Sequence, residues 1–373
     1  MPKKLIFSSI LFVLGFQLNA AESKNFKVEI RNDLPQMRTE MVAVSASEFP
    51  ESDFVIRDEH SCEVPWQRTF DGKIVFPASV GPKSTVVFMV SEGKPSRVEN
   101  ICHASFHPER IDDFAWENDY SAYRAYGPAS KGEMSGYDVF TKSNTRPVVQ
   151  ERYFNELVRR VSYHVDHGDG MDQYDVGPTL GAGGSAPVGK DGNLILPGAF
   201  SQWRILDNGP LRTTFELTYE YGGGRDIRTF TLDAGTPFNH VVSHLEGFDV
   251  DSIASGIVVH KGDTKSYTSG EGYVAYSDPT SAPAKGNGRI FIGVVDNGDG
   301  EVSYRSLPKT MKGGVGHLLI KSRLKRDKDY SYYWGASWSK GKTATFNQWV
   351  CEIEDFIRCR KNPLKIKISK CPD

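Results

Sequence analysis

The sequence predicts an all-β protein, a large antiparallel β-sandwich with one C-terminal helix. The chain has 373 residues with 36 Gly and 20 Pro, an abundance typical of turn-rich β proteins. About fifteen stretches alternate polar and apolar residues or are rich in β-branched residues, as half-buried strands do. No helical pattern lies between successive strands, so the strands should pair with antiparallel neighbours rather than form crossover units.

The predicted strands fall into two groups. The first group comprises residues 26–32, 40–45, 72–76 and 84–90. The second comprises residues 200–208, 212–221, 226–232, 238–245, 254–259, 272–277, 289–295, 316–325 and 329–338. Turn sequences such as Asn208-Gly209 separate members of the second group. Residues 100–146 are expected to be irregular, and residues 157–163 fit neither pattern clearly.

The C-terminal part supplies the single predicted helix. Residues 344–357 place Phe346, Trp349, Val350 and Ile353 on one side, as an amphipathic helix does. Residues 364–369 then form a last strand. Because no linker rich in Pro, Gly and Ser interrupts the chain, we expect residues 22–373 to form one domain.

The first 21 residues predict a secretory signal peptide. Lys3 and Lys4 precede an apolar run from Leu5 to Leu18, and Asn19, Ala20 and Ala21 supply small residues for cleavage. The run is too short to span a bilayer as a stable anchor, and no later segment is apolar enough to do so. The mature protein is therefore expected in a bacterial periplasm.

Charge and cysteine content narrow the functional classes. The net charge of −2 argues against nucleic acid as the main partner, because binding to phosphates needs a concentrated basic face. Cys351 and Cys359 should not pair, because eight residues of helix separate them by roughly 12 Å. The pairs Cys62–Cys102 and Cys359–Cys371 stay open.

Two stretches are unusually dense in side chains that move protons or bind anions. Residues 112–127 read DDFAWENDYSAYRAYG, and residues 163–177 read YHVDHGDGMDQYDVG. Such a density of His, Asp, Tyr and Arg is not needed for folding. It is typical of a site that binds an anionic sugar and transfers protons.

These stretches also carry a family resemblance. DDFAWENDYSAYRAYGPA (112–129), YHVDHGDGMDQYDVGPTLGAGG (163–184) and RTFTLDAGTPF (228–238) resemble the ulvan oligosaccharide dehydratases. These are exported bacterial proteins from polysaccharide-degrading gene clusters, long filed as a domain of unknown function. The third motif is similar to the galactose-mutarotase-like sandwiches.

The resemblance implies a fold and an activity. The fold is a galactose-mutarotase-like β-supersandwich with a concave sugar-binding face. The activity is removal of water from a glucuronic or iduronic acid at the non-reducing end of an ulvan-type oligosaccharide, with or without sulfate on the neighbouring sugar. The product is a 4,5-unsaturated uronate.

This chemistry needs three kinds of group. A base takes the hydrogen on C5, an acid protonates the departing 4-hydroxyl, and a cation or strong donors stabilise the charge on the carboxylate. Arg124 is the predicted carboxylate clamp, with Tyr123 and Tyr126 as phenolic acid or base. The alternative is that Arg124 pairs with Asp119 or Glu117 inside a loop.

His164 and His167 are the predicted proton carriers, because imidazole titrates near neutral pH. With Asp166 they also form a candidate ligand set for a divalent metal ion, the one cofactor the sequence leaves open. Trp116 is a candidate for stacking on a sugar, and Asn118 for binding hydroxyls. Further candidate substrate contacts are Tyr174, His260 and Lys261.

Other functions stay open at this point. A polysaccharide lyase would eliminate a sugar instead of water. A glycoside hydrolase needs a pair of carboxylates in defined roles, and no such pair stands out. A non-catalytic carbohydrate-binding protein would use the same aromatic residues and Arg124 without turnover.

Overall fold

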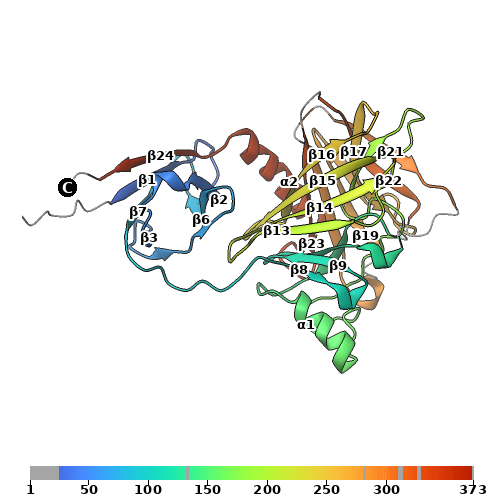
Figure 1. Ribbon diagram of the computed structural model, residues 1–373, viewed down its shortest axis with the longest axis horizontal. Coiled ribbons are helices and arrows are strands. Elements are labelled where there is room, and N and C mark those ends of the chain that lie inside the picture. The colour runs from blue at the N-terminus through green and yellow to red at the C-terminus, as the bar shows by residue number, and fades with distance from the viewer. Residues whose placement is uncertain are drawn as a thin grey trace, which may run out of the picture.

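A computed structural model describes residues 25–131, 134–279, 283–296, 298, 300–309, 314–325 and 329–371. The predicted signal peptide, residues 1–21, lies outside these residues. Figure 1 shows a small β-unit at one end of the molecule and a much larger sandwich at the other. The long connection after β7 and the helix α2 before β24 both run between them.

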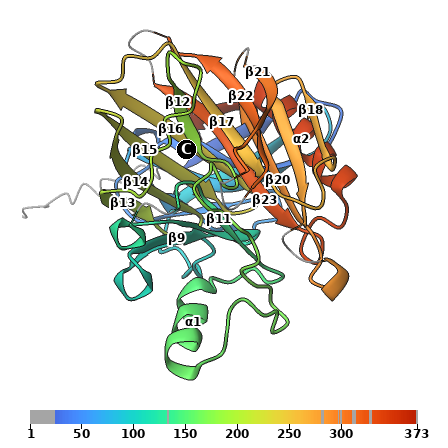
Figure 2. The same cartoon turned by 90° about the vertical axis from the view of Figure 1, so that its right-hand side faces the viewer.

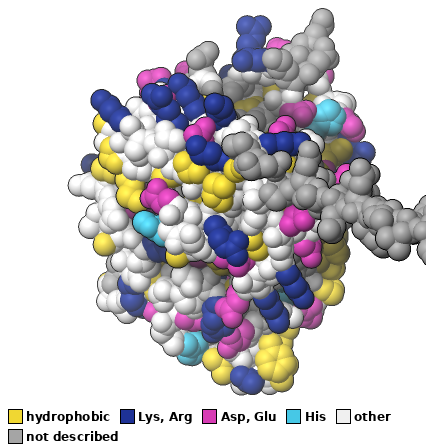
Figure 3. Space-filling model, turned by 90° about the vertical axis from the view of Figure 1, so that its left-hand side faces the viewer, with side chains coloured by type: hydrophobic (Ala, Val, Ile, Leu, Met, Phe, Trp, Pro, Cys, Tyr) yellow, Lys and Arg dark blue, Asp and Glu magenta, His cyan; other side chains and the backbone are white. Residues whose placement is uncertain are grey.

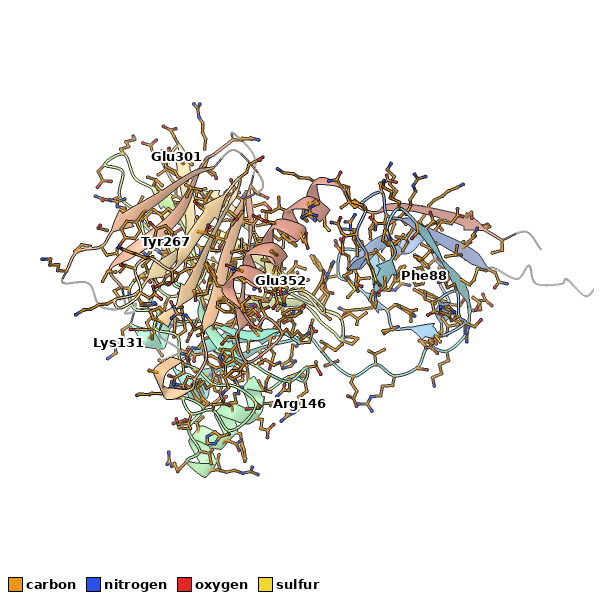
Figure 4. All side chains as sticks on the ribbon, turned by 180° about the vertical axis from the view of Figure 1, so that it is seen from behind. Phe88, Lys131, Arg146, Tyr267, Glu301 and Glu352 are labelled. Atoms are coloured by element: carbon orange, nitrogen blue, oxygen red, sulfur yellow. The ribbon has the colours of Figure 1, made fainter. Side chains whose placement is uncertain are left out.

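The small unit is a sandwich of two sheets. Its five-stranded sheet has the order β24-β1-β7-β3-β4, and its three-stranded sheet the order β2-β6-β5. The bounds are β1 Phe26–Arg31, β2 Arg38–Ser45, β3 Phe54–Arg57, β4 Glu63–Val64, β5 Gln67–Arg68, β6 Lys73–Val80, β7 Thr85–Glu92 and β24 Lys365–Lys370. Its own buried core includes Ile30, Phe76 and Phe88, and Figure 4 labels Phe88 inside it.

The large unit is built on an eight-stranded antiparallel sheet with the order β13-β14-β15-β16-β23-β20-β19-β18. The bounds are β13 Gln202–Asn208, β14 Arg212–Tyr221, β15 Gly224–Asp233, β16 Phe238–Glu246, β18 Tyr267–Gly270, β19 Tyr273–Asp278, β20 Ile290–Asp296 and β23 Tyr330–Trp338.

Two four-stranded sheets complete the large unit. One has the order β12-β17-β22-β21, with β12 Ser185–Val188, β17 Ser252–Val259, β21 Glu301–Ser306 and β22 Gly316–Arg323. The other, here called the lower sheet, has the order β11-β10-β9-β8, with β8 His103–His107, β9 Asp113–Glu117, β10 Ser121–Ala125 and β11 Asp138–Thr141. One hydrophobic core joins both of them to the eight-stranded sheet.

Two helices, α1 and α2, pack against the outer faces of the lower sheet and the eight-stranded sheet, respectively. α2 (Phe346–Lys361) begins at Thr345, whose side chain accepts a hydrogen bond from the Gln348 backbone N–H, and it buries Trp349 and Ile353 against the eight-stranded sheet. α1 (Val149–Phe154) continues into a π-helical turn, Asn155–Arg159, and lies below the lower sheet (Figures 1 and 2). Short 3₁₀ turns are Ala46–Glu48, Pro108–Arg110, Pro128–Ser130 and Pro283–Lys285.

The surface carries no concentrated charge on the face that Figure 3 shows, at the end formed by the small unit. Basic and acidic side chains are interspersed there. Among the described residues, no helix is long and apolar enough to cross a bilayer.

The predicted fold class is confirmed, with corrections in detail. The antiparallel sandwich, the C-terminal helix and the last strand are present, but α1 is a second helix that the sequence did not reveal. The segment 100–146 was wrongly expected to be irregular, since it forms the whole lower sheet. The large unit and the small unit each have their own main hydrophobic core, and the prediction of one domain over residues 22–373 stays a prediction. All five cysteines are free thiols.

Candidate active site

The lower sheet has two chemically different faces. Successive side chains of a strand point to opposite sides, so Trp116 and Tyr123 face the core while Asp113, Arg124 and Asp138 face outward. The outer face is covered by α1 and by the segment that follows it, through Val149, Tyr153 and Tyr163. Polar side chains are therefore enclosed between the lower sheet and this cover.

Arg124 is the centre of this enclosed group. Its Nε donates to Asp138 at 3.0 Å, its Nη1 to Asp113 at 3.3 Å, and its Nη2 to Asp172 at 3.1 Å and also to Asp138. Arg124 and Asp138 are direct partners in the β10–β11 pairing. Two tyrosines add contacts, the Tyr126 hydroxyl at 3.3 Å and the Tyr163 hydroxyl at 3.4 Å. We call Arg124, Asp113, Asp138, Asp172, Tyr126 and Tyr163 the Arg124 cluster.

Two carboxyl groups of this cluster have shifted pKa values. Burial raises the pKa of Asp113 to about 6, although Arg124 and Arg110 act in the opposite direction. Burial, reinforced by the neighbouring Asp138 charge, raises the pKa of Asp172 well above its ordinary value. Two of the carboxyl groups around Arg124, those of Asp113 and Asp172, therefore have raised pKa values, as residues of acid–base sites often do.

The rim of the cluster is formed by Arg110, Tyr163 and His164. Arg110 Nε donates to the Tyr163 hydroxyl at 2.7 Å, and its guanidinium lies 5.4 Å from the Tyr163 ring centroid. The Nη groups of Arg110 meet no acceptor within the described part of the chain. The Tyr163 hydroxyl thus accepts from two guanidinium groups, those of Arg110 and Arg124. Its own hydrogen is left without an acceptor among the described residues.

His164 has the geometry of a base. Its side chain is 50% exposed, and Nδ1 lies 3.1 Å from the backbone oxygen of Asp172. A carbonyl oxygen only accepts hydrogen bonds, so in the neutral ring Nδ1 carries the hydrogen. The lone pair is then on Nε2.

Local backbone strain lies beside Arg110. The 3₁₀ turn Pro108–Arg110 is followed by Ile111 and Asp112 with φ of 58° and 56°. Two consecutive residues in the left-handed region, one of them β-branched, are costly and concentrate at functional sites. The turn is held against Gly127, where an added Cβ would lie 2.2 Å from the Asp112 oxygen. The glycine that ends the first motif is needed for this contact.

Three residues that the first motif predicts for the site, Tyr123 as an acid or base and Trp116 and Asn118 as substrate contacts, are buried in the structure. Trp116 and Tyr123 are fully buried in the core, where Trp116 Nε1 donates to Asn239 at 2.7 Å and the Tyr123 hydroxyl donates to the Pro237 oxygen at 3.0 Å. Asn118 is also buried and organises the β9–β10 turn, since its Oδ1 accepts from the Tyr120 N–H at 2.9 Å. None of the three is exposed to solvent.

The structure favours the alternative for Arg124, an internal ion pair, over the predicted substrate clamp. A guanidinium has five N–H groups, and Arg124 already contacts three carboxylates and two phenols of the protein. The alternative of an internal ion pair is correct in kind, but with Asp113, Asp138 and Asp172 rather than Asp119 or Glu117. Tyr126 lies beside Arg124 as predicted, and its hydroxyl donates to Asp138 at 2.9 Å.

The candidate metal ligands do not converge. His164 contacts Asp172, His167 Nε2 lies 2.9 Å from the Ser162 oxygen, and Asp166 pairs with Lys340 at 2.7 Å. No group of three or more His, Cys, Asp or Glu side chains is arranged to hold a metal ion in the part of the chain that the structure describes. His167 is exposed on the segment after α1, outside the Arg124 cluster.

The candidate substrate contacts Tyr174, His260 and Lys261 form a separate group. His260 is buried, with Nδ1 2.7 Å from Asp278 Oδ2 and Nε2 2.7 Å from the Asp175 oxygen. Tyr174 packs edge-on against it with centroids 5.5 Å apart. Because both ring nitrogens are engaged within the protein, His260 fixes the segment around Asp175, and its role as a substrate contact stays a prediction. Lys261 is exposed beside it.

The sequence prediction missed Arg110, Asp113, Asp138 and Tyr163. Three of these lie in or beside the segment 100–146 that was expected to be irregular. A signal was present, because Asp113, Ala115 and Glu117 alternate with Phe114 and Trp116 as in a strand.

Comparison with known proteins gives the family and the fold. The chain is 27% identical over 286 residues to uncharacterized protein P7 of Formosa agariphila, which covers 72% of this chain and 70% of that protein. An alpha-mannosidase from Enterococcus faecalis V583 superposes with a TM-score of 0.50 at 8% identity, covering 94% of this chain and 46% of that structure.

A second E. faecalis structure, a protein in glycosyl hydrolase family 38, has a TM-score of 0.49 at 9% identity over 93% of this chain and 48% of its own. The chain thus spans about half the length of these solved structures, and the likeness concerns the fold alone. The model of one family, described as Domain of unknown function (DUF4861), matches residues 30–366, and the chain belongs to that family.

Proposed function

We propose that the protein is a hydro-lyase that removes water from the uronic acid at the non-reducing end of an acidic, ulvan-type oligosaccharide. The observation that carries this proposal is the Arg124 cluster with its rim. It combines a partly free guanidinium, a phenol with an available hydrogen and an imidazole with an available lone pair. The motif resemblance supports the same activity, and the predicted signal peptide supports a periplasmic location.

Arg110 binds the substrate carboxylate. Its Nη groups have no protein acceptor among the described residues, and a guanidinium matches a carboxylate with two parallel hydrogen bonds. This contact strengthens as the hydrogen on C5 leaves, because negative charge then accumulates on the carboxylate oxygens.

His164 and Tyr163 transfer the two protons. His164 Nε2 takes the hydrogen from C5, and the electron pair of the C5–H bond forms the C4–C5 double bond. The C4–O bond breaks, and the leaving hydroxyl takes the hydrogen of Tyr163 and departs as water. Arg110 and Arg124 stabilise the Tyr163 phenolate that remains, since both donate to its oxygen. Transfer of the proton from His164 to Tyr163, directly or through solvent, restores the enzyme.

The products test this proposal directly. Uronate-terminated oligosaccharides incubated with the protein should lose the mass of one water and gain the ultraviolet absorbance of a conjugated double bond. Release of a shorter sugar would indicate a lyase or a hydrolase instead. Tight binding without any change in mass would indicate a carbohydrate-binding protein.

A pair of histidine variants links the activity to the site. His164→Ala should lower kcat by about 10²–10⁴-fold, the usual range for loss of a general base. His244→Ala is the matched control, because His244 is also exposed but lies on β16, away from the Arg124 cluster, where it pairs with Asp329. Equal activity of both variants would remove His164 from the mechanism.

A further inference from the structure

Residues 172–180 connect the Arg124 cluster to the sheet β12-β17-β22-β21. At the start of this segment, the Asp172 carboxylate contacts Arg124 Nη2 at 3.1 Å, and the Asp172 backbone oxygen lies 3.1 Å from His164 Nδ1. At its end, Leu180 is buried against strands β12, β17 and β22. After Asp172 the segment contains no helix or strand. The positions of Asp172 and His164 therefore depend on contacts that other elements make with this segment.

Two buried histidines on neighbouring strands make such contacts. His260 directly follows β17, and its Nε2 lies 2.7 Å from the Asp175 backbone oxygen. His317 lies on β22, which pairs with β17 (Figure 2), and its Nε2 accepts a hydrogen bond from the Leu180 backbone N–H at 3.1 Å. The two residues are 5% and 1% exposed. We call His260 and His317 the histidine clamp.

The two hydrogen bonds of the clamp require rings of different charge. The Asp175 backbone oxygen only accepts, and a second acceptor, Asp278 Oδ2, lies 2.7 Å from His260 Nδ1. Both ring nitrogens of His260 must therefore carry a hydrogen, which makes the ring an imidazolium. His317 Nε2 instead accepts from the Leu180 N–H, so this nitrogen carries no hydrogen and the ring is neutral.

The surroundings of the two rings favour the same charge states. Burial lowers the pKa of His260, but the Asp278 carboxylate outweighs burial, and the His260 pKa lies above its ordinary value of 6.5. Burial lowers the pKa of His317 to about 4, and the charges of Arg305 and His260 act in the same direction. A charged His260 and a neutral His317 are therefore both expected near neutral pH.

Two phenols complete the surroundings of His260. The Tyr174 ring packs edge-on against it, and the Tyr276 hydroxyl accepts a hydrogen bond from the His260 backbone N–H at 3.2 Å. Burial raises the pKa of both phenols above the ordinary value, so neither carries a charge near neutral pH. The charged side chains that stabilise the His260 imidazolium are thus Asp278 and Asp175.

We propose that His260 and His317 are positioning residues for His164, which they orient by holding residues 172–180 with one charged and one neutral imidazole ring. The proposal rests on the proposed function, in which His164 is the base. The clamp touches no substrate, and it acts only through the backbone of the segment that it holds.

The clamp makes activity depend on pH in a defined direction. Above its pKa, His260 keeps a single hydrogen, for which Asp278 and the Asp175 backbone oxygen then compete. Because the His260 pKa is raised in the folded protein, the contact is complete below about pH 6.5 and is lost as pH rises through the raised value. The kcat of the unaltered protein should fall over the same pH range.

Nitrogen NMR of the full-length protein with isotope-labelled histidine measures the two charge states. At pH 7, His260 should show two protonated ring nitrogens, and His317 should show a protonated Nδ1 and an unprotonated Nε2. The His260 signal is identified by its magnetisation transfer to the Tyr174 ring, whose centroid lies 5.5 Å away. The His317 signal is the one in contact with the Leu180 N–H. A neutral His260 or a charged His317 at this pH would overturn the clamp.

Asp278→Asn tests whether the charged ring controls the reaction. It removes the carboxylate beside His260, so the fall of kcat on the alkaline side should move down by about 1–3 pH units. The KM should stay within about threefold, because substrate contacts are retained. Asp329→Asn is the matched control, since Asp329 also lies 2.7 Å from an imidazole, that of the exposed His244, and this variant should leave the pH profile unchanged.

The two proposals fail in different ways. A pH profile that Asp278→Asn leaves in place, or lowers equally at every pH, overturns the clamp while the dehydratase stands. Absence of dehydration in the unaltered protein overturns the proposed function, and hydrogen exchange then decides the clamp. At pH 8, amides of residues 172–180 should exchange at least about tenfold faster in Asp278→Asn than in Asp329→Asn, and equal exchange overturns the clamp. If Asp278→Asn does not fold, the NMR charge states of the unaltered protein decide.

Discussion

The two faces of the lower sheet differ in chemistry although they share the same strands. The inner face presents Trp116, Tyr123 and Tyr137 to an apolar core, where rings pack edge to face and stacked. The outer face presents Asp113, Arg124 and Asp138 to one another beneath α1. The inner face holds the sandwich together, and the outer face keeps charge buried at a cost in stability. Groups kept at such a cost are candidates for function.

The largest effect is expected from removing the charge at the centre of the outer face. Arg124→Met leaves three buried carboxyl groups without their cation and should lower the free energy of unfolding by about 3–5 kcal/mol. Denaturant unfolding measures this loss. Arg204→Met, which removes an exposed ion pair with Glu216, should cost no more than about 1 kcal/mol. Equal costs would contradict the assignment of a buried charge centre.

The next largest effect concerns how the free energy of unfolding changes with pH. The Asp113 pKa lies near 6 in the folded protein against 3.8 as a free side chain, so the folded state binds the proton more tightly. Its contribution to stability is greatest below pH 4 and declines by about 3 kcal/mol as pH rises through 6, since each pKa unit corresponds to about 1.4 kcal/mol. Asp113→Asn should remove this dependence.

Unfolding of the two proteins at pH 4.5 and pH 7.5 measures the difference. Relative to Asp113→Asn, the unaltered protein should be more stable at the lower pH than at the higher. A constant difference between the two proteins across this range would mean that Asp113 titrates normally and that the outer face is not a charge-strained site.

A smaller effect is expected at the rim. Arg110→Met removes the guanidinium that binds the substrate carboxylate. It should raise the activation free energy for kcat/KM by about 2–3 kcal/mol, which lowers kcat/KM roughly 30- to 150-fold. The folded state should change little, because Arg110 makes a single hydrogen bond to Tyr163. Arg225→Met, an exposed arginine on β15, is the control. Steady-state kinetics that do not separate the two variants would exclude Arg110 from the site.

The fold was easier to predict than the site, for a physical reason. The strand β15 alternates regularly, because one of its sides is buried and the other is partly exposed. The strands β9 and β10 are buried on both sides, and one side is charged. Their pattern therefore resembles a polar loop, although it marks a sheet with an enclosed acid–base site.

The burial of β9 and β10 on both sides also explains why the sequence did not show which face of the lower sheet each single residue occupies. Both motifs were recognised in the sequence by their density of functional side chains. In the structure, Arg124, Tyr126 and His164 do meet around Asp138 and Asp172. Which side chain faces outward depends on the pairing of β9, β10 and β11, and composition does not contain that information. A strand assignment for residues 113–117 and 121–125 would have separated Tyr123 from Arg124.

Paired tyrosine variants test the central claim most directly. Tyr163 and Tyr123 are both buried phenols near Arg124, one on each face of the lower sheet, and each loses only a hydroxyl on replacement by Phe. Measured on the same uronate-terminated oligosaccharide, Tyr163→Phe should lower kcat by about 10²–10⁴-fold, while Tyr123→Phe stays within about threefold of the unaltered protein. Full activity in folded Tyr163→Phe, or an equal loss in both variants, would contradict an acid–base site on the outer face.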